Sequence, residues 1–300
     1  MPFKQHISFA RRFIRGAIAE RRREALTPML PAPLRPDPAR WPEDRLTAAW
    51  LGHATVLLNV CGVTILTDPV LEHRIGIGRG RVKLGPRRLI EPALRADELP
   101  RPDLVLLSHS HMDHTDLGTL ARLERGVPVV VHRANRDLVR RFRNVTELDW
   151  GASTNVAGVR VEATPARHWG ARVLTDAHRG YGGFLVQSGG ATVLFAGDTA
   201  HTDQLTPLGR RHRIDLAILP IGAYDPWIAN HASPEEAWSM FQALGADWLL
   251  PIHHSTFRLS REPTAEPLER LLAAAGSEAW RVVGREVGAT WTLDNECYNT

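Results

Sequence analysis

The chain has 300 residues, 43% of them hydrophobic and 23% charged, which excludes a disordered chain, a coiled coil and a collagen-like repeat. The first 24 residues account for a charge of +5, and the other 276 have a net charge of −1. Because nucleic-acid-binding proteins usually carry basic charge on the folded domain itself, we expect no nucleic-acid partner.

Residues 1–26 form the first predicted unit, a basic amphipathic helix. Apolar residues recur there at helical spacing with arginines between them. Such a helix either packs on the domain or binds a membrane surface peripherally through residues 1–24, and the sequence leaves both open. The second unit, residues 27–45, is a linker that we expect to be extended, because six prolines lie in it.

The third unit, residues 46–300, is predicted to be an α/β domain. Ten short β-rich runs begin at TAAWLG (47–52) and end at WLLPIH (248–253). Helices are predicted between them at 117–124, 134–142, 234–244 and 264–275. The third of these has an N-cap at Ser233 and ends before Gly245. Many strands with helices among them indicate two sheets covered by helices.

The two cysteines, Cys61 and Cys297, are too few for a disulfide framework, and their scarcity is typical of a reducing compartment. No run approaches the ~20 apolar residues that span a bilayer, and no signal peptide is recognisable. These features predict a cytoplasmic protein, with peripheral contact at the inner face of the membrane as the alternative.

Residues 104–116, LVLLSHSHMDHTD, place His109, His111, Asp113 and His114 directly after an apolar run. Imidazole nitrogens and carboxylate oxygens suit a divalent ion such as zinc. In an extended backbone His109 and His111 point to the same side, and a turn after them would bring Asp113 and His114 toward a second ion. The alternative is a polar loop without metal.

Two metal ions need further ligands, and candidates lie at the ends of other apolar runs. They are His168, Asp198 and His253, with His254 as the alternative to His253. Strand ends in α/β sandwiches gather on one edge, where binding sites form. Their shared placement makes these residues candidates as a group.

Eight stretches show a family resemblance: WLGHATVLL (50–58), LTDP (66–69), SHSHMDH (108–114), RHWG (167–170), FAGDT (195–199), PIGAYDPW (220–227), HASPEEA (231–237) and PIHHSTF (251–257). The chain resembles the metallo-β-lactamase superfamily. Within it, the chain is similar to the branch of N-acyl-phosphatidylethanolamine-hydrolysing phospholipase D and the ascorbate-6-phosphate lactonase-like hydrolases. The resemblance implies a four-layer αββα sandwich with a binuclear metal site on its edge.

The resemblance also implies a set of ligands. One ion would be held by His109, His111 and His168, the other by Asp113, His114 and His253, with Asp198 bridging both. Asp68 would orient a ligand histidine through its free ring N–H. His53 would act in the same way or be a structural turn residue. The implied cofactor is a pair of divalent ions, zinc first, although manganese or iron suits the same donors.

A metal-bridging hydroxide would attack phosphorus or a carbonyl carbon, and Asp113 would accept the proton of the water while it ligates. His231 would contact the phosphate or the scissile group. Tyr224 and His178 are candidates for contact with the substrate. The segment 76–88 has basic but no acidic residues, which indicates a solvated loop or a contact for anionic headgroups.

Three functions remain in view. The first is a phosphodiesterase acting on a phospholipid-like, N-acyl-phosphatidylethanolamine type of substrate. The second is a hydrolase of a small soluble ester or lactone. The third is a non-catalytic metal-binding scaffold, which the complete ligand set disfavours. The sequence does not indicate an oligomeric state.

Overall fold

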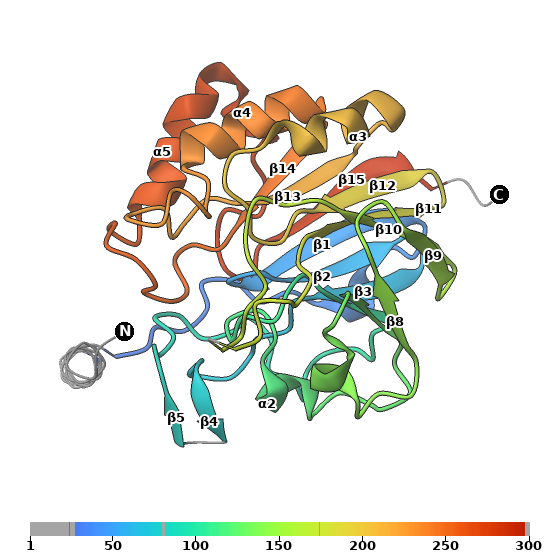
Figure 1. Cartoon of the computed structure of the whole chain (residues 1–300). Helices are drawn as coiled ribbons and strands as arrows, with labels where there is room; N and C mark the ends of the chain where they lie inside the picture. The colour runs from blue at the N-terminus through green and yellow to red at the C-terminus, as the bar shows by residue number, and fades with distance from the viewer. Residues whose placement is uncertain (1–23, 25–27, 80–81, 174, 298–300) are drawn as a thin grey trace.

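Two β-sheets form the centre of the molecule (Figure 1) in the computed structural model, which describes residues 24, 28–79, 82–173 and 175–297. The predicted helix at 1–26 therefore lies outside the described residues, apart from Glu24. In spatial order, one sheet contains β15 (Thr290–Glu296), β1 (Arg45–Gly52), β2 (Thr55–Val60), β3 (Val63–Thr67), β6 (Leu104–Leu107), β7 (Val129–His132) and β8 (Val145–Leu148). The other contains β14 (Trp248–Ile252), β13 (Leu216–Pro220), β12 (Ala191–Phe195), β11 (Gly183–Ser188), β10 (Val159–Thr164) and β9 (Ser153–Val156).

Each sheet has a parallel half, and these halves determine where the site lies. In the first sheet β3, β6, β7 and β8 run parallel. In the second, β12, β13 and β14 run parallel. Since the carboxyl ends of parallel strands reach the same edge of a sheet, the loops after these strands are neighbours.

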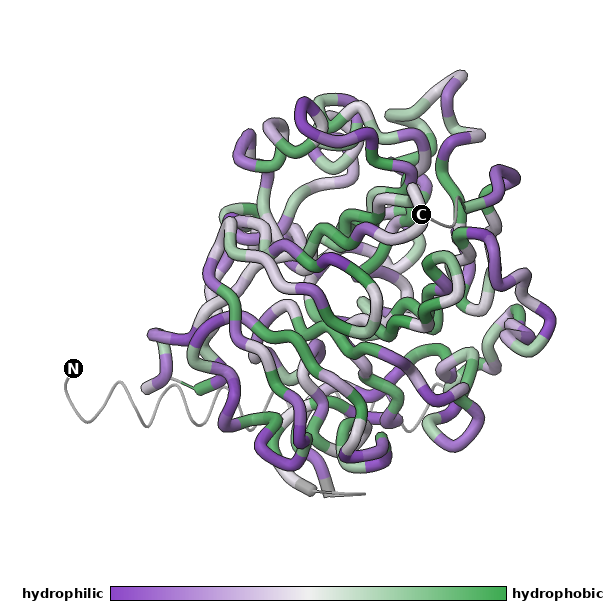
Figure 2. The backbone as a smooth tube through the Cα atoms, turned by 90° about the vertical axis from the view of Figure 1, so that its right-hand side faces the viewer, coloured by the Kyte–Doolittle hydropathy of each residue, from purple (hydrophilic) through white to green (hydrophobic). Residues whose placement is uncertain are grey.

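Alternation along the strands separates two cores. On β12 and β13, Val193, Phe195 and Ile218 face the core between the sheets. Their neighbours Leu194 and Ala217 face the opposite way and pack under helices. Figure 2 shows the corresponding hydrophobic stretches inside the molecule and hydrophilic loops around it.

Helices cover both outer faces, which confirms the predicted αββα architecture. The second sheet is covered by α3 (Thr206–Arg211), α4 (Pro234–Leu244) and α5 (Glu266–Ala275) (Figure 1). The first sheet has the short α2 (Leu117–Leu120) and the 3₁₀ turn η2 (Arg136–Val139). Further 3₁₀ turns lie at Pro38–Arg40 (η1), Asp203–Leu205 (η3) and Gly276–Arg281 (η4), and a separate hairpin pairs β4 (Ile77–Arg79) with β5 (Val82–Leu84).

Helix α4 begins and ends where the sequence predicts. Ser233 and Glu236 form a reciprocal capping box, and Gly245 ends the helix in the left-handed conformation. The predicted helix at 134–142 is wrong, because only the single turn η2 forms there. Its buried residues Val139 and Phe142 are three apart, so one turn is enough to bury both.

The linker packs on the domain, and the cysteines differ from expectation. Residues 28–45 follow the domain surface, with Leu30 hydrogen-bonded to Leu89 and Glu91. Cys61 and Cys297 are bonded to each other, so the scarcity of cysteine does not support a reducing compartment. Within the described residues, we find no helix with the length and apolar character needed to cross a membrane.

Candidate metal centre

The loop after β6 carries four of the predicted ligands, and a tight turn shapes it. The amides of His114 and Thr115 both donate to the carbonyl of His111. Asp116 then caps α2 by accepting from the Thr119 amide at 3.0 Å. The turn therefore directs the side chains on its two sides toward the same edge of the sandwich.

The first group consists of His109, His111, His168 and Asp198, whose donor atoms lie within 4.8 Å of one another. His109 Nε2 lies 2.8 Å from His111 Nδ1, and His168 Nε2 lies 3.2 Å from the same atom. Asp198 Oδ2 is 3.9 Å from His109 Nε2 and 3.8 Å from His168 Nε2. Residues that are far apart in sequence thus bring three imidazoles and one carboxylate together.

The second group consists of His53, Asp113, His114 and His253. Asp113 Oδ2 accepts from His53 Nε2 at 3.1 Å and lies 3.5 Å from His253 Nε2. Asp198, a member of the first group, also borders this one, because its Oδ2 lies 3.0 Å from His114 Nε2 and 3.2 Å from His253 Nε2. One carboxylate therefore borders both groups.

The donor atoms of both groups fit metal ions. In a tetrahedral zinc site with bonds of about 2.0–2.1 Å, ligand nitrogens lie about 3.3 Å apart, close to the spacing in the first group. His114 Nε2, His253 Nε2 and Asp198 Oδ1 are buried without a hydrogen-bond partner. Within the described residues, Asp113 and Asp198 form ion pairs only with histidines. Divalent cations would satisfy these atoms.

Hydrogen bonds at the far ring nitrogens orient two of the histidines. His114 Nδ1 donates to Asp68 Oδ2 at 2.7 Å. His109 Nδ1 donates to Ser108 Oγ at 2.9 Å, and that hydroxyl donates to Asp68. Since Nδ1 carries the proton in each case, Nε2 has a free lone pair that faces the group, as in many metal sites.

Burial and neighbouring charges set opposite protonation preferences among these rings. Burial lowers the pKa of His168 and of His53 to about 3. Burial also disfavours the charged form of His253, but the carboxylates of Asp198 and Asp113 outweigh it and raise the pKa to about 9. For Asp198, burial is outweighed by His114 and His253, which hold its pKa well below the usual range. The centre thus contains ionised carboxylates among buried imidazoles.

The backbone is strained around this centre. His53, Asp68, Ala223, His253 and Ser255 all have positive φ angles between 30° and 64°. Such angles are unfavourable for residues other than glycine and are concentrated at functional sites. At His253 the conformation follows directly after β14.

The remaining predicted site residues lie at different distances from the two groups. His231 is buried at the centre, with Nδ1 unpartnered and 3.8 Å from Asp198 Oδ2. The Tyr224 hydroxyl donates to Glu266 on α5 at 2.7 Å, so it is engaged outside the two groups. His178 is exposed and belongs to neither group. His254 stacks on Trp50 at 4.4 Å, so only its neighbour His253 joins the centre.

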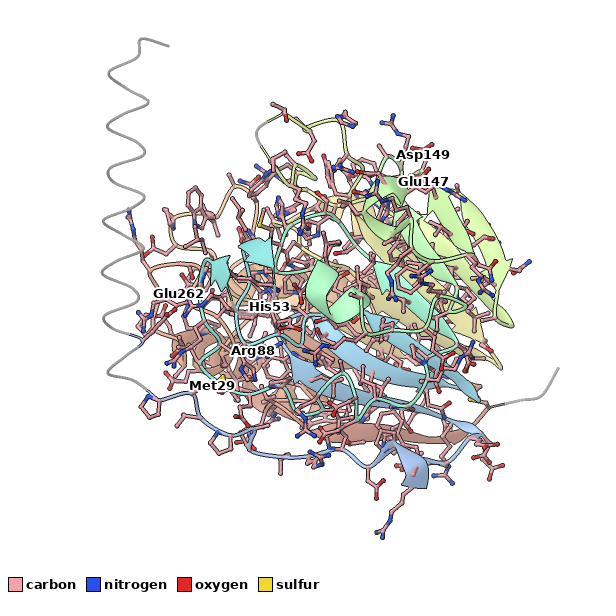
Figure 3. The ribbon with its side chains drawn as sticks, turned by 90° about the horizontal axis from the view of Figure 1, so that it is seen from below. Met29, His53, Arg88, Glu147, Asp149 and Glu262 are labelled. Carbon is pink, nitrogen blue, oxygen red and sulfur yellow. A yellow bond between two sulfur atoms is a disulfide. The ribbon has the colours of Figure 1, made fainter. Side chains whose placement is uncertain are left out.

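Sequence reasoning missed two supporting residues. Ser108 links Asp68 to His109, and its position directly before the histidine pair was the available signal. Arg88 is fully buried and donates to the carbonyls of Val70 and Glu72. It lies near His53 (Figure 3), and a Cβ added to Gly52 would lie 2.9 Å from its Nη1. The predicted solvated or headgroup-binding role of segment 76–88 therefore does not hold for Arg88.

An αββα sandwich with two adjoining histidine–carboxylate groups on one edge defines a class of metal-dependent hydrolases. The family model for the beta-lactamase superfamily domain matches residues 63–254. The chain therefore belongs to the metallo-β-lactamase superfamily, as the sequence motifs indicate.

Curated relatives and a solved structure agree with this assignment. Over 250 residues, the chain is 33% identical to N-acyl-phosphatidylethanolamine-hydrolyzing phospholipase D 1 of Caenorhabditis elegans, covering 76% of this chain and 69% of that protein. Over 256 residues, it is 31% identical to a UPF0173 metal-dependent hydrolase of Shouchella clausii, covering 83% and 100%. An isothiocyanate hydrolase from Delia radicum gut bacteria shares the fold, with a TM-score of 0.66, 17% identity and coverage of 82% and 99%. The chain is a metal-dependent hydrolase.

Proposed function

We propose that this protein is a binuclear metal-dependent phosphodiesterase that hydrolyses phospholipids of the N-acyl-phosphatidylethanolamine type. The observation that carries the proposal is the position of Asp198, whose Oδ2 borders both histidine–carboxylate groups. A carboxylate in that position can ligate two ions at once. Two adjacent ions, zinc or another divalent metal, would supply hydroxide at neutral pH and stabilise charge on the phosphate.

The residues divide into two ligand sets in this proposal. His109, His111 and His168 hold one ion. Asp113, His114 and His253 hold the other, and Asp198 contributes to both. Asp68 and Ser108 fix the ring orientation of His109 and His114, because they occupy the Nδ1 atoms of these rings.

Two residues have further roles in the proposed reaction. His53 holds one oxygen of Asp113 at 3.1 Å, so the carboxylate stays oriented while it accepts a proton from the nucleophilic water. His231 presents an unpartnered Nδ1 beside Asp198. That atom is placed to contact the phosphate or the leaving oxygen of the substrate.

The choice of substrate is supported by similarity and by charge. The C. elegans relative is named as a phospholipase D that hydrolyses N-acyl-phosphatidylethanolamine. The basic segment 1–24 has a charge of +5, which suits peripheral contact with anionic lipid. The net charge of −1 on the rest of the chain gives no electrostatic basis for binding nucleic acid.

A substrate panel on metal-loaded protein tests the proposal. Bis-nitrophenyl phosphate, a lactone and micellar N-acyl-phosphatidylethanolamine are each assayed before and after chelation. We expect metal-dependent turnover of both diesters and none of the lactone. Turnover of the lactone alone would replace the proposal with a soluble ester or lactone hydrolase. Metal binding without any turnover would indicate a non-catalytic scaffold.

A further inference from the structure

Exposed apolar side chains are concentrated in the loops around the metal centre. Eleven large apolar side chains are exposed among the described residues. Seven of them lie in the β4–β5 hairpin, at the start of α2, or in the loops after β10 and β13. They are Ile77, Leu84, Leu117, Trp169, Val173, Trp227 and Ile228. Single exposed apolar residues are ordinary, but a group beside a functional site marks an interaction surface.

The β4–β5 hairpin is joined to the loop that carries the ligands. Ile77 and Leu84 are direct cross-strand partners, and their exposed fractions are 62% and 53%. The neighbouring Lys83 is buried, and its ammonium contacts the Asp116 carboxylate directly after the ligand turn. The two apolar side chains therefore project from a hairpin that is fixed to the metal-bearing edge.

The remaining loops adjoin this hairpin. Arg88, just past β5, forms a β-bridge with Phe257 in the loop after β14. Farther along that loop, the Arg261 amide donates to the carbonyl of Asp225 at 2.9 Å. Trp227 and Ile228 follow Asp225 directly, and His168 Nδ1 donates to the carbonyl of Asn230. The exposed apolar residues thus lie on a continuous series of loops around the centre.

Exposed charged groups of both signs lie on the same edge, namely Asp225 and two arginines. Arg258 and Arg261 are exposed, and neither forms a salt bridge within the described part of the chain. Glu24 is bound by Arg74 through two hydrogen bonds, at 2.6 and 3.0 Å, and by the Arg87 amide at 2.9 Å. This clamp fixes Glu24 beside the hairpin.

We propose that the metal-bearing edge is a docking surface for an anionic lipid bilayer. The seven apolar side chains would enter the interfacial region, where tryptophan is favoured. The exposed side chains of Arg258 and Arg261 would contact the headgroups. The inference rests on the proposed function and goes beyond it, because it assigns membrane contact to the folded domain and orients the metal centre toward the bilayer.

Sedimentation with vesicles tests this surface. Full-length protein is mixed with phosphatidylcholine vesicles with and without phosphatidylglycerol. We expect binding to the anionic vesicles, weakened about tenfold or more in the double variant I77S/L84S, since its two exposed apolar side chains no longer enter the bilayer. The single variant I228S, in a different loop, should weaken binding severalfold.

The matched control is W280S, because Trp280 is 63% exposed but lies in η4, where its ring contacts that of Trp248 at the amino end of β14. Its vesicle binding should equal that of the wild type. Hydrolysis of bis-nitrophenyl phosphate should be unchanged in I77S/L84S, which shows that the variant is folded.

Three results would overturn the docking surface. The first is that both I77S/L84S and I228S bind vesicles as well as the wild type does. The second is that W280S loses as much vesicle binding as these variants. The third is that the variants change the self-association of the protein instead of its vesicle binding, which would identify the surface as a protein interface. Diester hydrolysis without vesicle binding would reject the docking surface and leave the proposed function standing. Vesicle binding without diester hydrolysis would reject the proposed function and leave the docking surface standing.

Discussion

Charged side chains have different kinds of partners at the two ends of the parallel strands. At the carboxyl ends, Asp113 and Asp198 are paired only with buried histidines, and several donor atoms have no partner. At the amino end of β14, Asp247 pairs with Arg213 at 2.8 Å, and Glu278 pairs with Arg281 at 2.7 Å. These residues line an open cavity of about 530 Å³ together with Trp248, Trp280 and Trp291.

The difference indicates which end is built for a ligand. Buried polar groups are costly unless they are satisfied. At the amino end, the carboxylates of Asp247 and Glu278 are exposed, so arginines from this chain and solvent satisfy them. At the carboxyl end, the buried atoms without partners require a ligand from outside the polypeptide. The open cavity lies at the amino end of the strands, whereas the buried atoms without partners identify the carboxyl end as the metal centre.

The largest expected effect is that of D198A. Because Asp198 borders both groups, its loss should release metal and reduce diester hydrolysis well beyond the 10–100-fold that is typical for loss of an outer-shell partner. Metal analysis by mass spectrometry and steady-state kinetics measure both effects. D247A, at the other end of the strands, is the control. Retention of two ions by D198A would reject the shared-carboxylate assignment.

A second prediction concerns a histidine outside both metal groups. His132 is buried, and burial lowers its pKa to about 4. The unfolded chain, with a pKa near 6.5, binds the proton first as the pH falls. Stability is therefore complete above about pH 6.5 and should decrease by about 3 kcal/mol between pH 6.5 and 4. Urea unfolding of metal-free protein should show a shallower pH dependence in H132N. An identical pH dependence of the free energy of unfolding in both proteins would show that His132 does not contribute to it.

Removal of the Asp68 carboxylate should have an intermediate effect. Asp68 accepts from His114 Nδ1 and from Ser108, so D68N would leave the ring orientation of two ligands unsupported. Metal affinity should fall by about 10–100-fold, measured by competition with a chromogenic chelator. An unchanged affinity would mean that packing alone orients the rings.

The smallest effect is expected at the opposite end. Arg213 is largely exposed, with 70% of its side chain accessible, so the pair with Asp247 is screened by solvent. D247N should change the free energy of unfolding by no more than about 1 kcal/mol and leave metal content unchanged. Loss of metal in D247N would contradict the separation between the two ends.

Local patterns in the sequence predicted much of this fold. Apart from the edge strand β8, the strands of the parallel halves are largely buried on both faces, so they appear as apolar runs. Helix α4 carries its own start and stop signals. Strands β8, β9 and β15 lie at sheet edges and are only partly buried, so their sequences lack a clear apolar pattern.

Contacts distant in sequence were not predictable in the same way. The motif residues of the centre could be named because each has metal-binding chemistry of its own. Tyr224 was expected to contact the substrate, but its hydroxyl bonds to Glu266, which is 42 residues away. The sequence around Tyr224 does not indicate this partner. The bond between Cys61 and Cys297 spans 236 residues, which spacing alone does not reveal.

The most direct test of the central claim is anomalous diffraction from crystals of the metal-loaded protein. The account predicts two metal peaks per chain, one beside His109, His111 and His168, the other beside Asp113, His114 and His253, with Asp198 contacting both. A single peak, or two peaks of which only one touches Asp198, would contradict it.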